Sequence, residues 1–95
     1  MTIKEYCLEI SKLLEEADHE KSKAFIQLGN LYITHKKEAL SNIKNIYGGM
    51  GSFNDLVLYN DGKVDIEANE KLSVLREDLY KEVLSETIEL RSYYS

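Results

Sequence analysis

Two histidines and one cysteine could carry acid–base or nucleophilic chemistry near neutral pH. His19 and His35 are the only histidines, and Cys7 is the only cysteine. An imidazole changes charge near neutral pH, so each histidine is a candidate general acid or base. Neither has a serine or cysteine at a spacing that indicates a dyad or triad. We therefore expect no enzyme activity, and we expect His35 to be partly or wholly buried on the side of the helix bundle, with a hydrogen-bond partner.

The remaining candidate groups favour packing and turns over catalysis or metal binding. Cys7 lies on an apolar helix face between Glu5 and Glu9, and such surroundings raise a thiol pKa. One cysteine also excludes an internal disulfide framework and a multi-cysteine zinc site. The acids after residue 53 are too loosely spaced for a calcium loop, so Asn60-Asp61-Gly62 is interpreted as a turn. No metal and no cofactor are expected.

A glycine cluster is the most distinctive motif of the chain. Three of the five glycines (Gly48, Gly49 and Gly51) fall within four positions, and Ser52 follows them. Glycine tolerates positive φ and close backbone approach, so the cluster predicts a tight structural turn. It lacks the Gly-Lys-Ser/Thr ending of a phosphate-binding loop. We expect positive φ at one of these glycines and a cost of ~1 kcal/mol or more for alanine there.

Length and composition indicate one small globular domain spanning residues 1–95. The chain has 95 residues, 43% hydrophobic and 31% charged, with no proline to interrupt helices. No apolar run approaches the ~20 residues of a membrane span, and no signal peptide is visible at the N-terminus. We therefore expect a cytoplasmic protein without membrane contact.

Charge is unevenly distributed along the acidic chain, whose formal net charge is −5. Residues 1–20 carry six acids and two lysines, and residues 67–95 carry seven acids and four bases. Residues 21–47 instead carry five lysines and one acid. An acidic protein repels nucleic acid and attracts basic partners, so nucleic-acid binding is not expected. The lysine-rich stretch is interpreted as a solvated helix face that pairs with the acidic helices.

Hydrophobic periodicity predicts three helical regions. Residues 2–17 form the first, which Thr2 and Glu5 begin as a capping box. The second runs from about Lys21 to Tyr47, with Gly29-Asn30 and residues 34–38 as the candidate interruptions. The third begins near Glu67 or Asn69 and ends near Arg91, with a wide apolar face that predicts contact with two neighbours. The expected fold is mainly α, with three to four packed helices.

Residues 53–66 are expected to form a small β-hairpin that lies on the helices. Two short apolar runs flank the turn signature Asn60-Asp61-Gly62-Lys63. A two-stranded hairpin is marginal alone and needs support from packing. Residues 54–59 as a short helix capped by Ser52 remain an alternative.

The sequence around the glycine cluster resembles a bacterial domain family of unknown function. The matching residues are Ile46-Tyr47-Gly48-Gly49-Met50-Gly51-Ser52-Phe53-Asn54-Asp55-Leu56-Val57-Leu58. Members of that family carry Gly-Gly-Met-Gly-Ser-x-Asn-Asp-Leu after two helices. They occur in toxin–immunity neighbourhoods, among proteins like the immunity partners of contact-dependent growth-inhibition toxins. The resemblance implies a structural role for Gly48–Leu56 and supplies no catalytic role.

The expected function is an immunity protein that binds and neutralises a cognate toxin, such as a nuclease. A nuclease toxin binds the phosphates of nucleic acid and is therefore basic, so an acidic inhibitor associates with it quickly. The carboxylates expected to contact it are Glu5, Glu9, Glu15, Glu16, Asp55, Asp61, Asp65, Glu77 and Asp78. The alternatives are a small enzyme or ligand-binding protein that uses the Gly48–Asp55 loop, and a scaffold subunit of an oligomer. The oligomeric state does not follow from the sequence.

Overall fold

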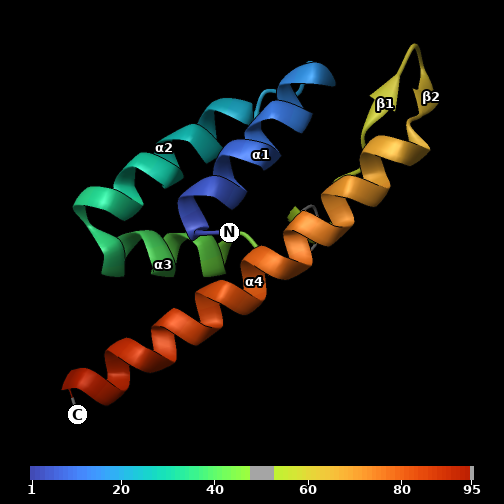
Figure 1. The fold of residues 1–95 in the computed structure, drawn as a ribbon. Coiled ribbons are helices and arrows are strands. Elements are labelled where there is room, and N and C mark those ends of the chain that lie inside the picture. The colour runs from blue at the N-terminus through green and yellow to red at the C-terminus, as the bar shows by residue number, and fades with distance from the viewer. Residues whose placement is uncertain (48–52, 95) are drawn as a thin grey trace.

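The chain forms four helices and one small hairpin, as the computed structural model in Figure 1 shows. The structure describes residues 1–47 and 53–94, and side chains as far as Leu90. The glycine cluster, with its expected positive φ, lies outside the described residues. The elements are α1 (Ile3–Glu16), α2 (Ser22–Thr34), α3 (Lys36–Asn45), the 3-10 helix η1 (Phe53–Asp55), β1 (Tyr59–Asn60), β2 (Lys63–Val64) and α4 (Ile66–Tyr94). The prediction of a mainly α fold is confirmed.

The capping box predicted at the start of α1 is present. The Thr2 hydroxyl accepts the Glu5 backbone N–H at 3.2 Å, and the Glu5 carboxylate accepts the Thr2 N–H at 2.9 Å. These reciprocal bonds satisfy two donors that a helix start otherwise leaves unpaired. They also lower the pKa of Glu5, chiefly through the bond from the Thr2 backbone. The predicted apolar stripe faces the core, where four α1 side chains are fully buried: Ile3, Cys7, Ile10 and Leu14.

The second helical region is interrupted at His35, within the predicted window. His35 has φ −139° and ψ 71°, outside the helical range, so α2 ends at Thr34 and α3 begins at Lys36. The alternative interruption at Gly29 is wrong. Gly29 is buried inside α2, where a Cβ would lie 3.5 Å from the Cys7 Cβ of α1. Gly29 therefore serves close packing of two helices, which helical periodicity alone does not indicate.

An aromatic cluster joins η1 to α2 and α3. The Phe53 ring centroid lies 4.8 Å from that of Phe25 and 5.4 Å from that of Tyr47. The Phe53 N–H donates to the Ile46 carbonyl at 3.0 Å, and the Asn54 side chain donates to the Tyr47 carbonyl at 2.5 Å. These contacts hold the two ends of the glycine-rich segment together.

The hairpin is shorter than predicted and does not lie on the helices. Its strands have two residues each, and the helical alternative survives only as the three residues of η1. Asp61 and Gly62 both have positive φ (52° and 78°), as a type I′ turn requires. In Figure 1 the hairpin stands beyond the N-terminal end of α4, and both of its strands are exposed. The expectation of packing on the helices was wrong because hydrogen bonds at its base support it instead.

Asn69 of α4 provides that support. Its Nδ2 donates to the carbonyls of Leu58 (2.9 Å) and Asp65 (2.7 Å), and its Oδ1 accepts the Leu58 N–H at 2.8 Å. The Asp65 carboxylate accepts the Ala68 N–H at 3.0 Å and so caps α4. Leu58, 1% exposed, anchors the base of the hairpin in the core.

Helix α4 runs the length of the molecule, whose principal extents are 50 × 23 × 21 Å. It packs against both α1 and α3, so the predicted contact with two neighbours is confirmed. Among its side chains as far as Leu90, the buried ones are Leu72, Leu79 and Val83. Near its C-terminal half, Glu86 accepts a hydrogen bond from the Tyr32 hydroxyl (2.5 Å) and pairs with Lys36 (2.7 Å). This polar group links α2, α3 and α4.

Candidate protein-binding surface

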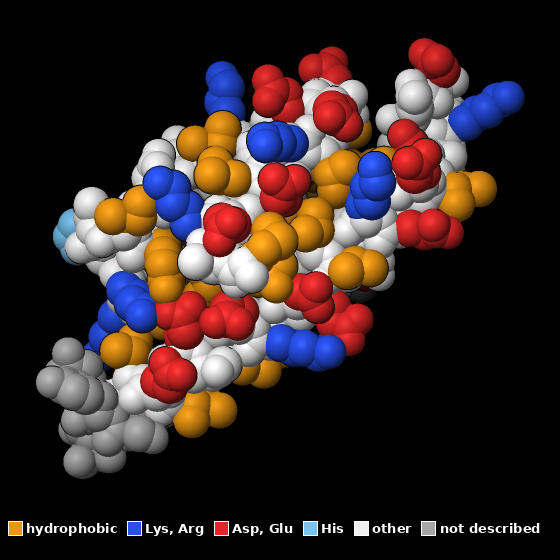
Figure 2. Space-filling view, in the orientation of Figure 1, with side chains coloured by type: hydrophobic (Ala, Val, Ile, Leu, Met, Phe, Trp, Pro, Cys, Tyr) orange, Lys and Arg blue, Asp and Glu red, His pale blue; other side chains and the backbone are white. Residues whose placement is uncertain are grey.

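A shallow groove follows the seam between α1 and α4. It encloses about 580 Å³ and has an apolar floor rimmed by three carboxylates and two ammonium groups. The lining residues are Glu9, Lys12, Leu13, Glu16, Glu70, Lys71, Val74 and Leu75. Val74 is 60% exposed, so the floor is open to solvent. Figure 2 shows hydrophobic atoms along this seam with charged side chains on both sides.

Carboxylates from both helices continue the groove toward the start of α1. Asp78 follows Val74 by one turn of α4, and Glu82 follows Asp78 by another. Burial raises the pKa of the Tyr6 phenol, and the nearby charges of Asp78, Glu82 and Glu5 raise it further. Acids distant in the sequence therefore share one surface, which we call the seam face: Glu5, Glu9, Glu16, Glu70, Asp78 and Glu82.

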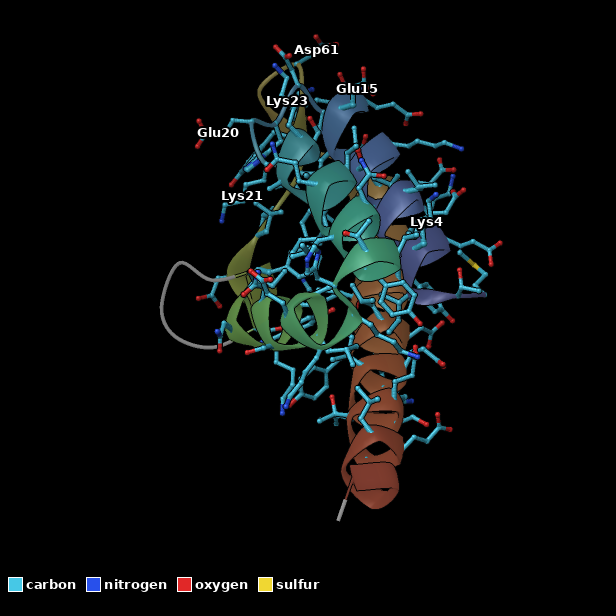
Figure 3. All side chains as sticks on the ribbon, turned by 90° about the vertical axis from the view of Figure 1, so that its left-hand side faces the viewer. Lys4, Glu15, Glu20, Lys21, Lys23 and Asp61 are labelled. Atoms are coloured by element: carbon cyan, nitrogen blue, oxygen red, sulfur yellow. The ribbon has the colours of Figure 1, made fainter. Side chains whose placement is uncertain are left out.

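The nine carboxylates predicted to bind a partner do not form one site. Four belong to the seam face: Glu5, Glu9, Glu16 and Asp78. Glu77 instead faces a hollow on another side of α4, and Asp55 ends η1. Glu15 and Asp61 lie at one end of the molecule, at the α1 terminus and the hairpin tip (Figure 3). Because α4 is a helix, the neighbours Glu77 and Asp78 point in different directions.

Several of these acids already have partners within the chain. Glu9 pairs with Lys12 at 3.5 Å and Glu77 with Lys81 at 3.2 Å. Glu5 and Asp65 accept helix-capping hydrogen bonds, as described above. Among the described residues, the carboxylates of four of the nine make neither a hydrogen bond nor an ion pair: Glu15, Glu16, Asp61 and Asp78. An external partner can therefore pair with these four without breaking a contact among the described residues.

The lysines of residues 21–47 only partly pair with acidic helices. Lys36 makes the ion pair with Glu86 of α4. Lys21 and Lys23 lie at the same end of the molecule as Glu15 and Glu20 (Figure 3). The alternation of charge along the sequence therefore does not produce two separate electrostatic faces, because the turn after α1 brings both signs together.

A second hollow lies beside η1 and supports the alternative of a ligand site. It encloses about 410 Å³ and is lined by Tyr47, Asn54, Ser73, Arg76, Glu77 and Tyr80. The Tyr47 hydroxyl donates to the Arg76 carbonyl at 2.7 Å, and Arg76 Nη1 donates to the Phe53 carbonyl at 3.1 Å. Burial raises the pKa of Tyr47 far above its usual value. The Tyr47 hydroxyl and the Arg76 guanidinium in this hollow therefore already make hydrogen bonds that connect α4 to the segments around η1.

The prediction that His35 is buried was wrong. The residue is exposed, and its Nδ1 lies 3.0 Å from the Thr34 hydroxyl. It lines an open hollow with Lys36, Lys37 and Glu38. A histidine in such a polar, open position is a better candidate for acid–base catalysis than one buried in the core. The interruption between α2 and α3 turns this position outward. His19 is half-buried, and its Nδ1 accepts the Lys21 backbone N–H at 3.1 Å, which shapes the turn before α2.

Cys7 is buried, as predicted, and burial raises the pKa of its thiol to about 12. The thiolate is the reactive form, so it is scarce in the folded protein at pH 8. We expect Cys7 to react with a thiol reagent such as dithiobis(nitrobenzoate) in the native protein no faster than the protein unfolds. The same reagent should label it within minutes in guanidinium. Rapid labelling of the native protein at pH 8 would contradict its burial.

The part of the chain that the structure describes holds neither a cluster of metal-ligating side chains nor a membrane-spanning helix. Within residues 1–47 and 53–94, no three histidine, cysteine or acidic side chains gather as a metal site would require. No helix among these residues is both long enough and apolar enough to cross a membrane.

The sequence did not indicate that four apolar residues of the hairpin region are exposed to solvent. Val57, Tyr59, Val64 and Ile66 are 44%, 55%, 52% and 70% exposed. Alternation identified this region as strands, but it could not tell which side of a two-residue strand faces the core. Leu58 occupies that side, and its neighbours point outward.

Fold and surface together define a small helical protein with an acidic seam face. The chain belongs to the family of a domain of unknown function, DUF6966, whose model matches residues 10–67. The match begins within α1 and ends at the start of α4, so it includes the hairpin. No curated protein and no solved structure matches the chain.

Proposed function

We propose that this protein is an immunity protein that neutralises a basic cognate toxin by binding it, without catalysis. The observation that carries the proposal is the seam face, where acids of α1 and α4 border an exposed apolar groove. Protein interfaces combine an apolar centre with a polar rim, and negative charge accelerates association with a basic partner. The resemblance at Gly48–Leu56 to proteins from toxin–immunity neighbourhoods supports the same function. Such a protein acts in the cytoplasm, where a delivered toxin works.

Charge reversal on the seam face tests the proposal. Glu16→Lys with Asp78→Lys should slow association with the toxin and reduce the protection of cells that produce it. Exposed charges act mainly on association rate, so the loss should be about tenfold or more at low salt and smaller at high salt. Neither carboxylate makes an ion pair with another described residue, so the fold should remain intact. Surface plasmon resonance at two salt concentrations and a survival assay provide the measurements.

Glu20→Lys with Glu38→Lys is the matched control. It changes the net charge by the same amount, but neither acid belongs to the seam face. If both double variants slow association equally, only the total charge matters and the seam face is not the site. If neither variant changes binding in low or high salt, the electrostatic mechanism fails.

A ligand-binding protein or small enzyme is the second candidate, because Asn54, a residue of the predicted Gly48–Asp55 site, lines a hollow together with Arg76. The two functions differ in an observable way. An immunity protein binds one macromolecule saturably, and the variant Ser73→Leu, which alters the hollow, should still protect cells. A protein that binds its ligand in this hollow should lose that binding in the same variant.

A further inference from the structure

The hairpin region has features of a binding element that core packing does not explain. Cross-strand pairing sets Tyr59 opposite Val64, so both side chains lie on the same face of the hairpin. Successive residues of a strand point to opposite sides, and Leu58 points into the core. The face that bears Tyr59 and Val64 is therefore directed away from the protein's own core.

Two further exposed apolar residues flank the hairpin in the sequence. Val57 precedes Tyr59 by two residues, and Ile66 begins α4 two residues after Val64. We call the four exposed residues Val57, Tyr59, Val64 and Ile66 the hairpin apolar face. Figure 2 shows hydrophobic atoms on the outer side of the hairpin region, next to acidic side chains. Exposed apolar side chains gathered on one protruding element are typical of interaction sites.

The hairpin is also held in place before any partner arrives. A type I′ turn closes its tip, the Asp65 N–H donates to the Leu58 carbonyl at 3.0 Å, and Asn69 holds its base. A preorganised element loses little conformational entropy when it binds. Tyrosine is among the residues that most often dominate the energy of an interface.

The charge of the hairpin region indicates which kind of partner binds the hairpin apolar face. Residues 55–71, which include the hairpin, carry five acids and two lysines, a net charge of −3. A second copy would bring the same negative charge against it, and an anionic membrane would also be repelled. A basic protein surface is complementary to this charge.

We propose that the hairpin apolar face inserts into the basic toxin and anchors the complex, whereas the seam face steers its approach. This inference rests on the proposed function and names the part of the protein that determines dissociation. Contacts at a buried apolar centre chiefly control the dissociation rate, and charges at the rim chiefly control association.

The test replaces the apolar pair without disturbing the strands. Tyr59→Thr with Val64→Thr removes apolar surface and places β-branched threonine, which strands favour, at both positions. The matched control is Ile26→Thr with Ile33→Thr, which changes two α2 side chains that are 40% and 60% exposed. Circular dichroism should show that both double variants melt close to the wild type. The probe is the purified protein encoded by the neighbouring open reading frame, which the proposed function assigns as the toxin.

We expect the hairpin variant to dissociate from this probe about 30-fold faster or more, with a nearly unchanged association rate, and the control to bind like the wild type. If the wild type binds the probe and the hairpin variant binds equally well, the inference is wrong and the proposed function stands. If the wild type does not bind, both are wrong. Sedimentation that shows a wild-type dimer and a monomeric hairpin variant would instead assign this face to a second copy and overturn the inference.

Discussion

Phe53→Ala should lower the free energy of unfolding by about 3–5 kcal/mol, the usual cost of truncating a buried aromatic ring. Phe53 is 2% exposed and contacts the rings of Phe25 and Tyr47. The Arg76 guanidinium carbon lies 5.8 Å from its ring centroid, so a cation–π contact is lost as well. Domains of this size have only about 5–15 kcal/mol of stability, so this one change removes a large part of it.

Urea denaturation followed by circular dichroism measures the effect. Tyr59→Ala is the control, because this aromatic ring is 55% exposed on the hairpin and its truncation should cost less than 1 kcal/mol. Equal losses for the two variants would show that the cluster around Phe53 does not contribute to the core as its burial indicates.

Asn69→Ala should lower the free energy of unfolding by about 2–3 kcal/mol and loosen the hairpin. The substitution removes three hydrogen bonds to half-buried backbone groups, and no other side chain in the described residues contacts the Leu58 N–H. Leaving such groups without partners costs about 1–3 kcal/mol. Hydrogen exchange should show lost protection at Leu58 and Asp65, with little change in α1.

Asn42→Ala is the control for Asn69→Ala. Asn42 is exposed within α3, and alanine has the higher helix propensity, so this change should be neutral or slightly stabilising. Unchanged exchange at Leu58 after Asn69→Ala would mean that the hairpin keeps its place by packing rather than through Asn69.

Features set by nearby residues could be predicted from the sequence. The Thr2–Glu5 capping box, the turn at Asp61-Gly62 and the interruption near residues 34–38 each depend on a few consecutive residues. The apolar stripe of residues 2–17 also predicted which face of α1 is buried, because the side chains of one continuous helix repeat with a constant period. Local chemistry therefore located most helix ends to within a few residues.

Features that depend on distant residues could not be predicted. His35 continued the apolar stripe of a single long helix, but the interruption there changes the helical phase and turns it to solvent. The support of the hairpin by Asn69 joins residues 11 apart, and the pairing of Lys36 with Glu86 joins residues 50 apart. The seam face was only partly predicted, since the acids of α1 and α4 were known but their shared groove was not.

The length of α4 has a consequence for how the molecule moves in solution. At 1.5 Å per residue, its 29 residues span about 44 Å, close to the longest extent of 50 Å and about twice the other two. A body of this shape rotates faster about its long axis than end over end. Amide N–H bonds of α4 lie along that axis, so their nuclear spin relaxation should differ from that of bonds lying across it. Binding of a partner at the hairpin end would lengthen this axis and slow the end-over-end rotation most.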